Sequence, residues 1–304
     1  WAKPLLISST LTQATIYVLR PMITYRALEL DANAAQIGLI ASVYALFPVL
    51  LALQFGKWVG RMGEAKFIIY GTLAMLVTSA GLMVANSILW LSIAAACAGT
   101  AHLACMVGGQ SMVALRAPRE SYDRYFGFYT FSASVGHMLG PIVAAVVAGS
   151  NGNLPKSTSN AFLLGVVLTI LALFPVIRWR NERPTVVAQQ NSEGTYKTAL
   201  NLVKRPGILA AIYISLAISS AADVLVVFLP LFGTENNFSP YAVGAILAIR
   251  AGTTMLSRLF LGRLSERFTT FQLLWWSTVI SVISCAAMAF ARTPLTLGLI
   301  VFVA

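Results

Sequence analysis

The feature that most constrains this chain is a series of long apolar stretches that are almost free of charge. They run about 17–25 residues without strand-like alternation, the length that carries an α-helix across a lipid bilayer. Since backbone groups in lipid must be hydrogen-bonded within the protein, only helices or closed barrels span membranes. We therefore predict an all-α transmembrane fold. The stretches span residues 5–26, 36–55, 67–85, 88–113, 125–148, 161–177, 208–232, 240–261 and 271–290, and a tenth starts near residue 295.

Composition excludes a water-soluble fold. The 304 residues are 58% hydrophobic and 10% charged, whereas soluble domains carry roughly 25% charged residues. A net charge of +11 on a soluble protein would suggest nucleic-acid binding. Here the charges lie in short segments between apolar stretches, as in membrane proteins, so we expect a lipid bilayer and no nucleic acid as partner.

The segments between the apolar stretches face the two sides of the membrane in turn. The basic residues are distributed unequally between these two sides. Fourteen Lys and Arg residues lie in the segments of one side, and three, Arg26, Lys156 and Arg292, lie on the other. Positive residues concentrate in cytoplasmic loops. We predict a multi-pass protein with a cytoplasmic N-terminus, in a bacterial inner (plasma) membrane. The first stretch itself would serve as the targeting signal, and we expect the chain to be a piece of a longer protein, because it ends inside an apolar stretch.

An internal repeat divides the chain. Ile37-Gly38 lies ahead of a basic Gly56–Arg61 segment at the same spacing as Val243-Gly244 lies ahead of Gly262–Arg267. Both copies run in the same direction and are six stretches apart, which indicates two halves related by an axis along the membrane normal. We predict an N-terminal half at 1–177, a polar cytoplasmic linker at 178–207, and a C-terminal half at 208–304 that is cut off within its tenth helix.

The segment Gly56-x-x-x-Gly60-Arg61-x-Gly63 resembles the second-to-third helix loop of the major facilitator superfamily. The family has an acidic residue where this chain has Gly60. A second copy, Gly262-x-x-x-Glu266-Arg267, keeps the acid but has Thr269 in place of the last glycine. The resemblance implies a gating loop at these positions. It also implies two pseudo-symmetric six-helix bundles, with nine to ten of twelve helices present here.

The fifth stretch carries a second resemblance. Gly127, Gly136, Gly140 and Pro141 match the fifth-helix signature of exporters in the same family, although Ala144 and Ala145 replace its final glycines. Small residues that recur every four positions form a ridge that lets another helix approach closely. We expect the fifth and eighth helices to meet. The family's fourth-helix arginine is missing, so proton coupling through that residue has no support.

Charged groups inside the membrane are costly and often mark a transport pathway. Arg20 shares one face of the first helix with Gln13 and Tyr17, by spacings of three and four residues. Asp223 and Arg250 lie at similar depths on sequential antiparallel helices. We expect these two to form an ion pair, with Arg20 as the alternative partner for Asp223, and a purely structural pair remains open. Tyr44 occupies the repeat position that matches Arg250.

Neither the histidines nor the cysteines form a recognisable cofactor or metal site. His102 and His137 lie on separate helices, and we expect hydrogen-bonded interior rings more than a proton-carrying role, although either could titrate. Cys97, Cys105 and Cys285 lie inside apolar stretches without metal-ligand spacing. No phosphate-binding loop is present, and we expect no cofactor.

The functional hypothesis that follows is a monomeric secondary transporter that moves a small organic solute by alternating access, with protons as a second candidate partner. Export by proton antiport is favoured by the fifth-helix signature, and an uptake permease or facilitator is the alternative within this class. A non-transporting sensor or receptor-like protein is the alternative of another class. A membrane enzyme is disfavoured because no nucleophile, base or metal-ligand cluster appears.

Overall fold

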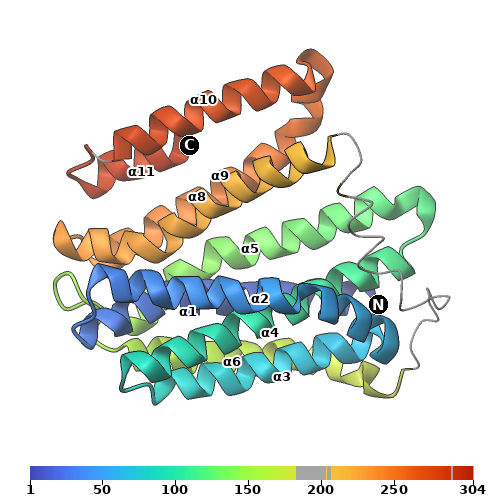
Figure 1. Ribbon diagram of the computed structural model, residues 1–304, viewed down its shortest axis with the longest axis horizontal. Helices are drawn as coiled ribbons and strands as arrows, with labels where there is room; N and C mark the ends of the chain where they lie inside the picture. Colours follow the sequence, from blue (N-terminus) through green and yellow to red (C-terminus); the bar gives the residue numbers. More distant parts are fainter. Residues whose placement is uncertain (183–202, 204–206, 289, 304) are drawn as a thin grey trace.

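The computed structural model describes residues 1–182, 203, 207–288 and 290–303. These residues are almost entirely helical and form long rods that run roughly side by side (Figure 1). In chain order the elements are α1 (Ala2–Glu29), α2 (Ala34–Met62), α3 (Glu64–Met83), α4 (Ile88–Arg116), the 3₁₀ helix η1 (Arg119–Ser121), α5 (Tyr122–Ala148), α6 (Thr158–Val176), the 3₁₀ helix η2 (Ile177–Asn181), α8 (Ile208–Glu235), α9 (Pro240–Arg267), α10 (Thr270–Met288) and α11 (Pro294–Val303).

The all-α transmembrane prediction is confirmed, and each predicted stretch overlaps one of these helices over most of its length. Five helical segments of the described chain are long and apolar enough, by length and composition, to cross a membrane: Ala34–Met62, Glu64–Met83, Ile88–Arg116, Arg119–Ala148 and Thr158–Asn181. The predicted linker at 178–207 begins with the end of η2, and most of its remainder lies outside the described residues.

The polar first helix occupies an interior position. α1 contacts α4, α5 and α6 on one side and α8 on the other, and Ile16, Val18 and Leu19 are fully buried. Two of its buried hydroxyls bond to its own backbone: Thr12 Oγ1 donates to the carbonyl of Ser8 at 2.8 Å, and Thr15 Oγ1 donates to the carbonyl of Leu11 at 2.9 Å. Hydroxyls satisfied in this way can be buried without an unpaired polar group, so α1 can carry a polar face into the bundle.

A tight turn joins α2 to α3 through one glycine. Gly63 has φ of +88°, a conformation that side chains with a Cβ rarely adopt. Gly56 and Gly60, which the resemblance places in a loop with it, lie inside α2, because that helix runs to Met62. The connection between the two helices therefore begins at Gly63.

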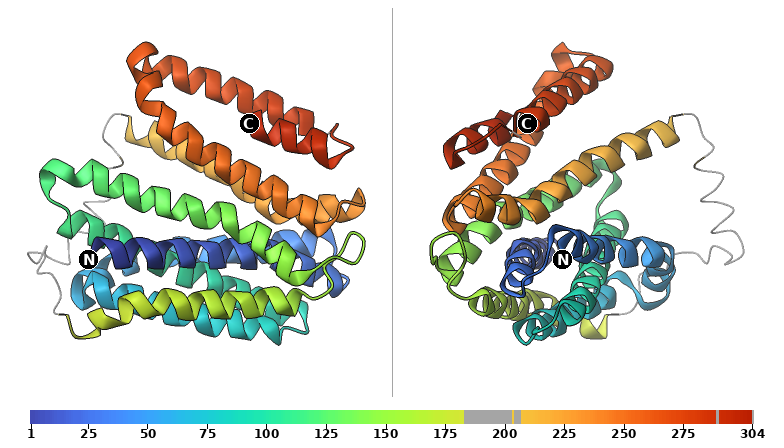
Figure 2. Two further views of the ribbon diagram at one scale, coloured as in Figure 1. Left: turned by 180° about the vertical axis from the view of Figure 1, so that it is seen from behind. Right: turned by 60° about the vertical axis from the view of Figure 1, so that its left-hand side comes forward.

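α8 and α9 lie against α1 and α5 at one end of the molecule and diverge from them toward the end that holds the N-terminus (Figures 1 and 2). Side-chain exposure on α8 follows this divergence. Tyr213 and Leu216, in its first half, are 74% and 63% exposed, whereas Val226 and Leu229, in its second half, are 0% and 3% exposed. We call the end with the N-terminus the basic end, because Lys57, Arg61 and Lys66 lie there, and the other the opposite end.

Candidate functional site

An ion pair joins the first helix to the seventh predicted span. Arg20 Nη1 on α1 lies 2.6 Å from Asp223 Oδ1 on α8. The arginine side chain is 9% exposed and the carboxylate is 53% exposed. We expected Asp223 to pair with Arg250, and this preference was wrong: the described ion pairs join Asp223 to Arg20, the alternative partner. The reason is that α8 lies against α1 at this depth, while Arg250 lies on α9, which packs on α5.

The surroundings of Arg20 close the opposite end of the molecule. The guanidinium carbon lies 4.8 Å from the centre of the Tyr44 ring, a favourable cation–π distance. One turn further toward the opposite end, Thr24 Oγ1 donates to the carbonyl of Val227 at 2.9 Å. Beyond that, Asn153 Nδ2 donates to the carbonyl of Thr234 at 2.9 Å. From the ion pair outward, these contacts therefore hold α8 to α1 and to the turn between α5 and α6.

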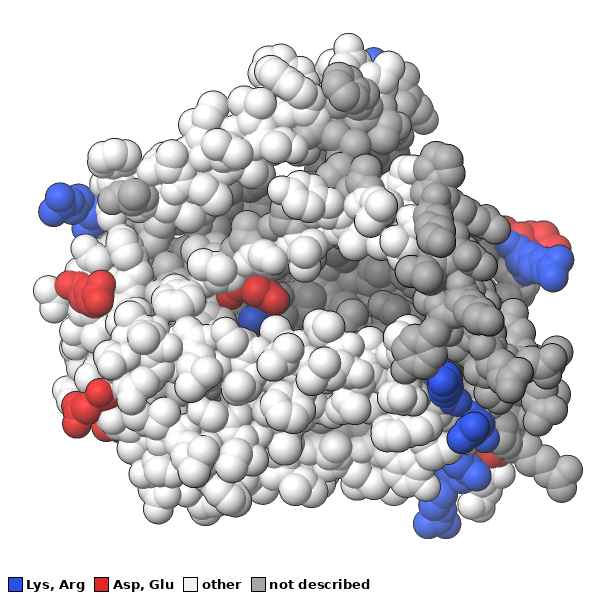
Figure 3. Space-filling model, in the orientation of Figure 1, with Lys and Arg blue, Asp and Glu red and all other residues white. Residues whose placement is uncertain are grey.

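The ion pair is open to the basic end. Figure 3 shows a hollow between the two groups of helices, with an acidic side chain beside a basic one on its described wall. This agrees with the exposed carboxylate of Asp223 and with the exposed first half of α8. The arrangement places one charged pair between a closed end and an open end, which is the geometry of a solute-binding cavity with access from one side.

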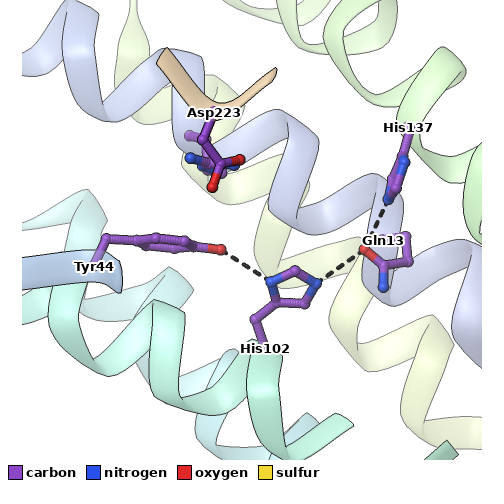
Figure 4. A network of polar contacts seen from close by, with 6 residues as sticks. Gln13, Tyr44, His102, His137 and Asp223 are labelled. Carbon is purple, nitrogen blue, oxygen red and sulfur yellow. Dashed lines mark hydrogen bonds and ion pairs between the residues drawn. The ribbon is translucent and has the colours of Figure 1, made fainter. Parts of the chain in front are cut away.

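A second polar cluster lies one to two turns away, toward the basic end of α1 (Figure 4). The carbonyl oxygen of Gln13 lies 3.0 Å from Nε2 of His102 and 3.0 Å from Nε2 of His137. The other ring nitrogen of His102, Nδ1, lies 3.0 Å from the hydroxyl of Tyr44. The His137 ring stacks on Tyr17, with centroids 4.0 Å apart. Four helices, α1, α2, α4 and α5, thus contribute to one hydrogen-bonded cluster.

A separate hollow of about 1130 Å³ lies apart from this site, among α2, α3 and α4. Its walls are almost entirely apolar, and they include Phe47, Trp58 and Tyr70. None of the polar residues predicted for the site lines it. This hollow has the character of a lipid-facing groove, and the polar chemistry of the described chain is concentrated around α1.

The glycine ridge of the fifth helix packs differently from our expectation. A Cβ at Gly136 or Gly140 would meet the backbone of α1, with the carbonyls of Thr10 and Ala14 as the nearest atoms. The expected meeting of α5 with the eighth span, α9, is present, but it runs through Gly244, whose Cβ position lies 2.7 Å from the Pro141 carbonyl. Gly127 has no atom within 4 Å of its Cβ position. Gly136 and Gly140 therefore allow the close approach of α1 to α5.

The loop residues that resemble the family's gating motif lie at the basic end. Arg61 is exposed in the last turn of α2, and Arg267 is exposed at the end of α9. Gly262 and Glu266 fall on residues whose side chains lie outside the described part of the structure.

Sequence reasoning missed a buried ion cluster beside this loop. Arg116 donates from Nε to Glu64 at 2.9 Å and from Nη2 to Glu182 at 2.6 Å. Glu64 is 1% exposed although it directly follows the turn glycine. The sequence did contain a signal for this cluster. Glu64 lies in the first turn of α3 and Arg116 in the last turn of α4, and charges of these signs favour those helix ends.

The fold and the site define a multi-helix membrane protein with one charged pair, Arg20–Asp223, beside a hollow between two groups of helices. Residues 5–304 match the family model described as Major Facilitator Superfamily, and the chain belongs to this family.

Curated relatives of this chain are named as multidrug resistance proteins or efflux pumps. It is 24% identical over 275 residues to the "Multi-drug resistance efflux pump PmrA homolog" of Lactococcus lactis subsp. lactis, with 87% of this chain and 65% of that relative covered. It is 22% identical over 308 residues to the "Multidrug resistance protein MdtG" of Yersinia enterocolitica, with 96% and 71% covered. The chain thus spans about two thirds of the length of these relatives.

Solved structures show the same fold. A bacterial homolog of the human lysosomal transporter Spinster, solved in an inward-facing and unoccupied conformation, has a TM-score of 0.73 at 16% identity, with 99% of this chain and 71% of that chain covered. The nucleoside transporter NupG, solved as a mutant, has a TM-score of 0.77 at 14% identity, with 99% and 78% covered.

Proposed function

We propose that this chain forms most of an exporter that moves amphipathic small organic solutes out of the cell in exchange for protons. The observation that carries this proposal is the Arg20–Asp223 pair, which lies at the closed end of a cavity that opens toward the basic end. The basic end faces the cytoplasm by the positive-inside rule. A solute would therefore enter the cavity from the cytoplasm and meet the pair at its deepest point.

Alternating access requires the contacts at the opposite end to open. In this proposal residues 1–177 and 208–304 move as two bodies, and the α1–α8 contacts separate while the basic end closes. The Arg20–Asp223 attraction holds the closed end in place. The half-exposed carboxylate of Asp223 is the partner that solvent and solutes can reach, so the contact can be broken from the cavity side.

The chemistry of the cavity supports amphipathic cargo. Arg20 and Asp223 neutralise each other, and Tyr17 and Tyr44 add aromatic faces with a polar atom each. Such a lining can accommodate apolar bodies and satisfy a few polar groups, as ligand pockets usually do. The names of the relatives, which are multidrug resistance and efflux proteins, support export over uptake.

The test is solute movement in proteoliposomes that hold the protein in lipid with an imposed pH gradient. Amphipathic compounds and small metabolites are screened. We expect an amphipathic compound to accumulate in a gradient-dependent way, and to a higher level than in vesicles without protein. Movement that follows the solute gradient alone indicates a facilitator, and accumulation in the reverse direction indicates an uptake permease. Absence of movement across the whole screen, from folded protein, favours the sensor alternative.

A further inference from the structure

The hollow among α2, α3 and α4 is a groove that follows from where small and large residues lie on these helices. α2 and α3 both pack along α4 and contact each other little. Small residues lie between them, among them Ala96, Ala101 and Ala104 on α4. Large side chains form the walls and stay exposed, since Trp58 is 42% and Val77 is 72% exposed. This apolar groove is therefore open to whatever surrounds the helices.

The apolar groove is as long as the hydrocarbon layer of a membrane is thick. Its wall on α2 runs from Leu39 to Met62, with lining residues spaced three or four positions apart. A helical stretch of this length spans roughly 35 Å, and the hydrocarbon core of a bilayer is about 30 Å thick. The acyl chains of a lipid from one leaflet therefore match about half of the groove.

The serine and threonine side chains of the groove are bonded within their own helices. Thr78, Ser92 and Thr100 line the groove. Each of these hydroxyls donates to the carbonyl four residues earlier, at 2.8, 2.7 and 2.8 Å respectively. Pockets for drug-sized ligands usually hold a few polar groups that fix the ligand. A wall that is almost entirely apolar, with its hydroxyl protons already bonded, suits hydrocarbon chains better.

The basic residues of α2, α3 and α4 all lie at one end of the apolar groove. They are Lys57 and Arg61 near the end of α2, Lys66 at the start of α3 and Arg116 at the end of α4. The one acid on these three helices, Glu64, is buried and paired with Arg116. Figure 3 shows basic side chains gathered at this end of the molecule. The groove therefore has a positive rim at the basic end, and these helices place no Lys or Arg at its other end.

Two cations of this rim lie beside aromatic residues that line the groove. Arg61 follows Trp58 by one helical turn, and Lys66 directly precedes Phe67. Phe55 packs against both rings, with centroids 5.5 Å from Trp58 and 5.2 Å from Phe67. Tryptophan is typical of the boundary between hydrocarbon and head groups. A lipid with its acyl chains in the groove would thus bring its head group to the two cations.

We propose that the apolar groove binds one phospholipid with an anionic head group, which lies against Arg61 and Lys66 while its acyl chains lie along α2, α3 and α4. Basic residues at a membrane surface attract anionic lipids, which supplies the preference for negative charge. The head group bridges the last turn of α2 and the first turn of α3, on either side of Gly63. The lipid touches neither Arg20 nor Asp223, so this inference does not depend on the proposed export.

The test is native mass spectrometry of the whole chain, released from detergent micelles that contain phosphatidylglycerol or phosphatidylcholine with the same acyl chains. The chain should retain one phosphatidylglycerol and bind it at least about tenfold more tightly than phosphatidylcholine, because two cations face the head group. Arg61→Gln/Lys66→Gln should remove this preference. Arg119→Gln/Arg124→Gln removes two exposed cations from the same end, outside the groove lining, and should keep the preference.

A second matched pair of variants tests where the acyl chains lie. Ala74 is exposed and lines the groove, whereas Ala52 is exposed on α2 outside the groove lining. Ala74→Trp should lose the retained phosphatidylglycerol, because the indole fills the groove, and Ala52→Trp should keep it. Thermal unfolding gives an independent readout, since a ligand that binds the folded state raises the midpoint. Phosphatidylglycerol should raise the midpoint of wild type and Ala52→Trp, and should leave that of Ala74→Trp unchanged.

Three results would overturn the proposal. The first is equal retention of the two lipids by the wild-type chain. The second is a loss of preference in Arg119→Gln/Arg124→Gln as large as in Arg61→Gln/Lys66→Gln. The third is unchanged retention of phosphatidylglycerol in folded Ala74→Trp. Tetraphenylphosphonium, added in place of lipid, tests for a solute in the groove: if the wild-type chain retains this cation, Ala74→Trp loses it and no phospholipid is retained, the groove is a solute site and the lipid assignment is wrong.

Discussion

Arg20 and Asp223 lie 2.6 Å apart although 203 residues separate them in the chain. The pair joins α1 to α8 beside the point where exposure along α8 changes, since Val224 is 56% exposed and Val226 is fully buried. Its partners differ in solvent access, since the arginine is buried and the carboxylate is half exposed. A contact with this asymmetry can be broken from the cavity side, which is what a gate between two moving bodies requires.

The first prediction concerns the energetics of this pair. Asp223→Asn leaves a buried guanidinium without its charged partner and should lower the free energy of unfolding by about 1–3 kcal/mol. The double variant Arg20→Gln/Asp223→Asn should regain part of that loss, because removing both charges is cheaper than stranding one. Thermal unfolding in detergent measures both. Additive losses in the double variant would show that the two residues do not interact.

A second prediction compares two glycines of α5. Gly140→Ala places a methyl group 2.8 Å from the Ala14 carbonyl and from Cβ of Tyr17, and overpacking of this kind should destabilise the protein by about 1–3 kcal/mol. Gly127→Ala meets no atom within 4 Å and should be neutral or stabilise by up to about 1 kcal/mol, because alanine favours the helix. The same unfolding assay checks both. Equal effects would contradict the packing of α5 on α1.

A third prediction concerns the ion cluster at the basic end. Arg116→Gln removes the charge opposite the buried Glu64 and should destabilise the protein by roughly 3 kcal/mol, as breaking a buried ion pair does. Glu182 is 37% exposed, so Glu182→Gln should have a much smaller effect. Arg119→Gln, at an exposed neighbouring position, serves as the control and should be close to neutral. A larger loss in Glu182→Gln than in Arg116→Gln would contradict the burial argument.

A fourth prediction tests the orientation in the membrane. Asn151 lies in the exposed turn between α5 and α6, and Glu120 lies in the exposed η1 at the basic end. In a chain whose three cysteines are first replaced by alanine, Asn151→Cys should react with a membrane-impermeant maleimide in intact cells. Glu120→Cys should react only after the membrane is opened. The reverse pattern would place the basic end outside the cell and would reverse the proposed direction of transport.

The spans could be predicted from sequence because lipid imposes length and composition on each of them. The predicted stretch at 271–290, for example, corresponds to α10 at Thr270–Met288. The partner of Asp223 could not be predicted in the same way. The sequence gives the depth of a residue along its helix, and both Arg20 and Arg250 were candidate partners at a depth similar to that of Asp223. Which one lies closer depends on how α8 packs, and no local pattern encodes that arrangement.

The Gln13 cluster shows the same limit. The spacing of Gln13, Tyr17 and Arg20 correctly placed them on one face of the first helix, but His102 appeared as an isolated histidine on another helix. Only the packing of α1, α2, α4 and α5 brings its two nitrogens to Tyr44 and Gln13. Likewise, the spacing of Gly136 and Gly140 predicted a close helix contact, and the structure was needed to show that α1 makes it.

The central claim, that the Arg20–Asp223 contact couples solute export to proton entry, is tested most directly by recording solute movement and internal pH together in proteoliposomes. Wild-type protein should move both, and Asp223→Asn should move neither while remaining folded. Glu235→Gln, which removes an exposed carboxylate at the far end of the same helix, should behave as wild type. Unchanged solute and proton movement in Asp223→Asn would contradict the account and would leave the ion pair a structural role only.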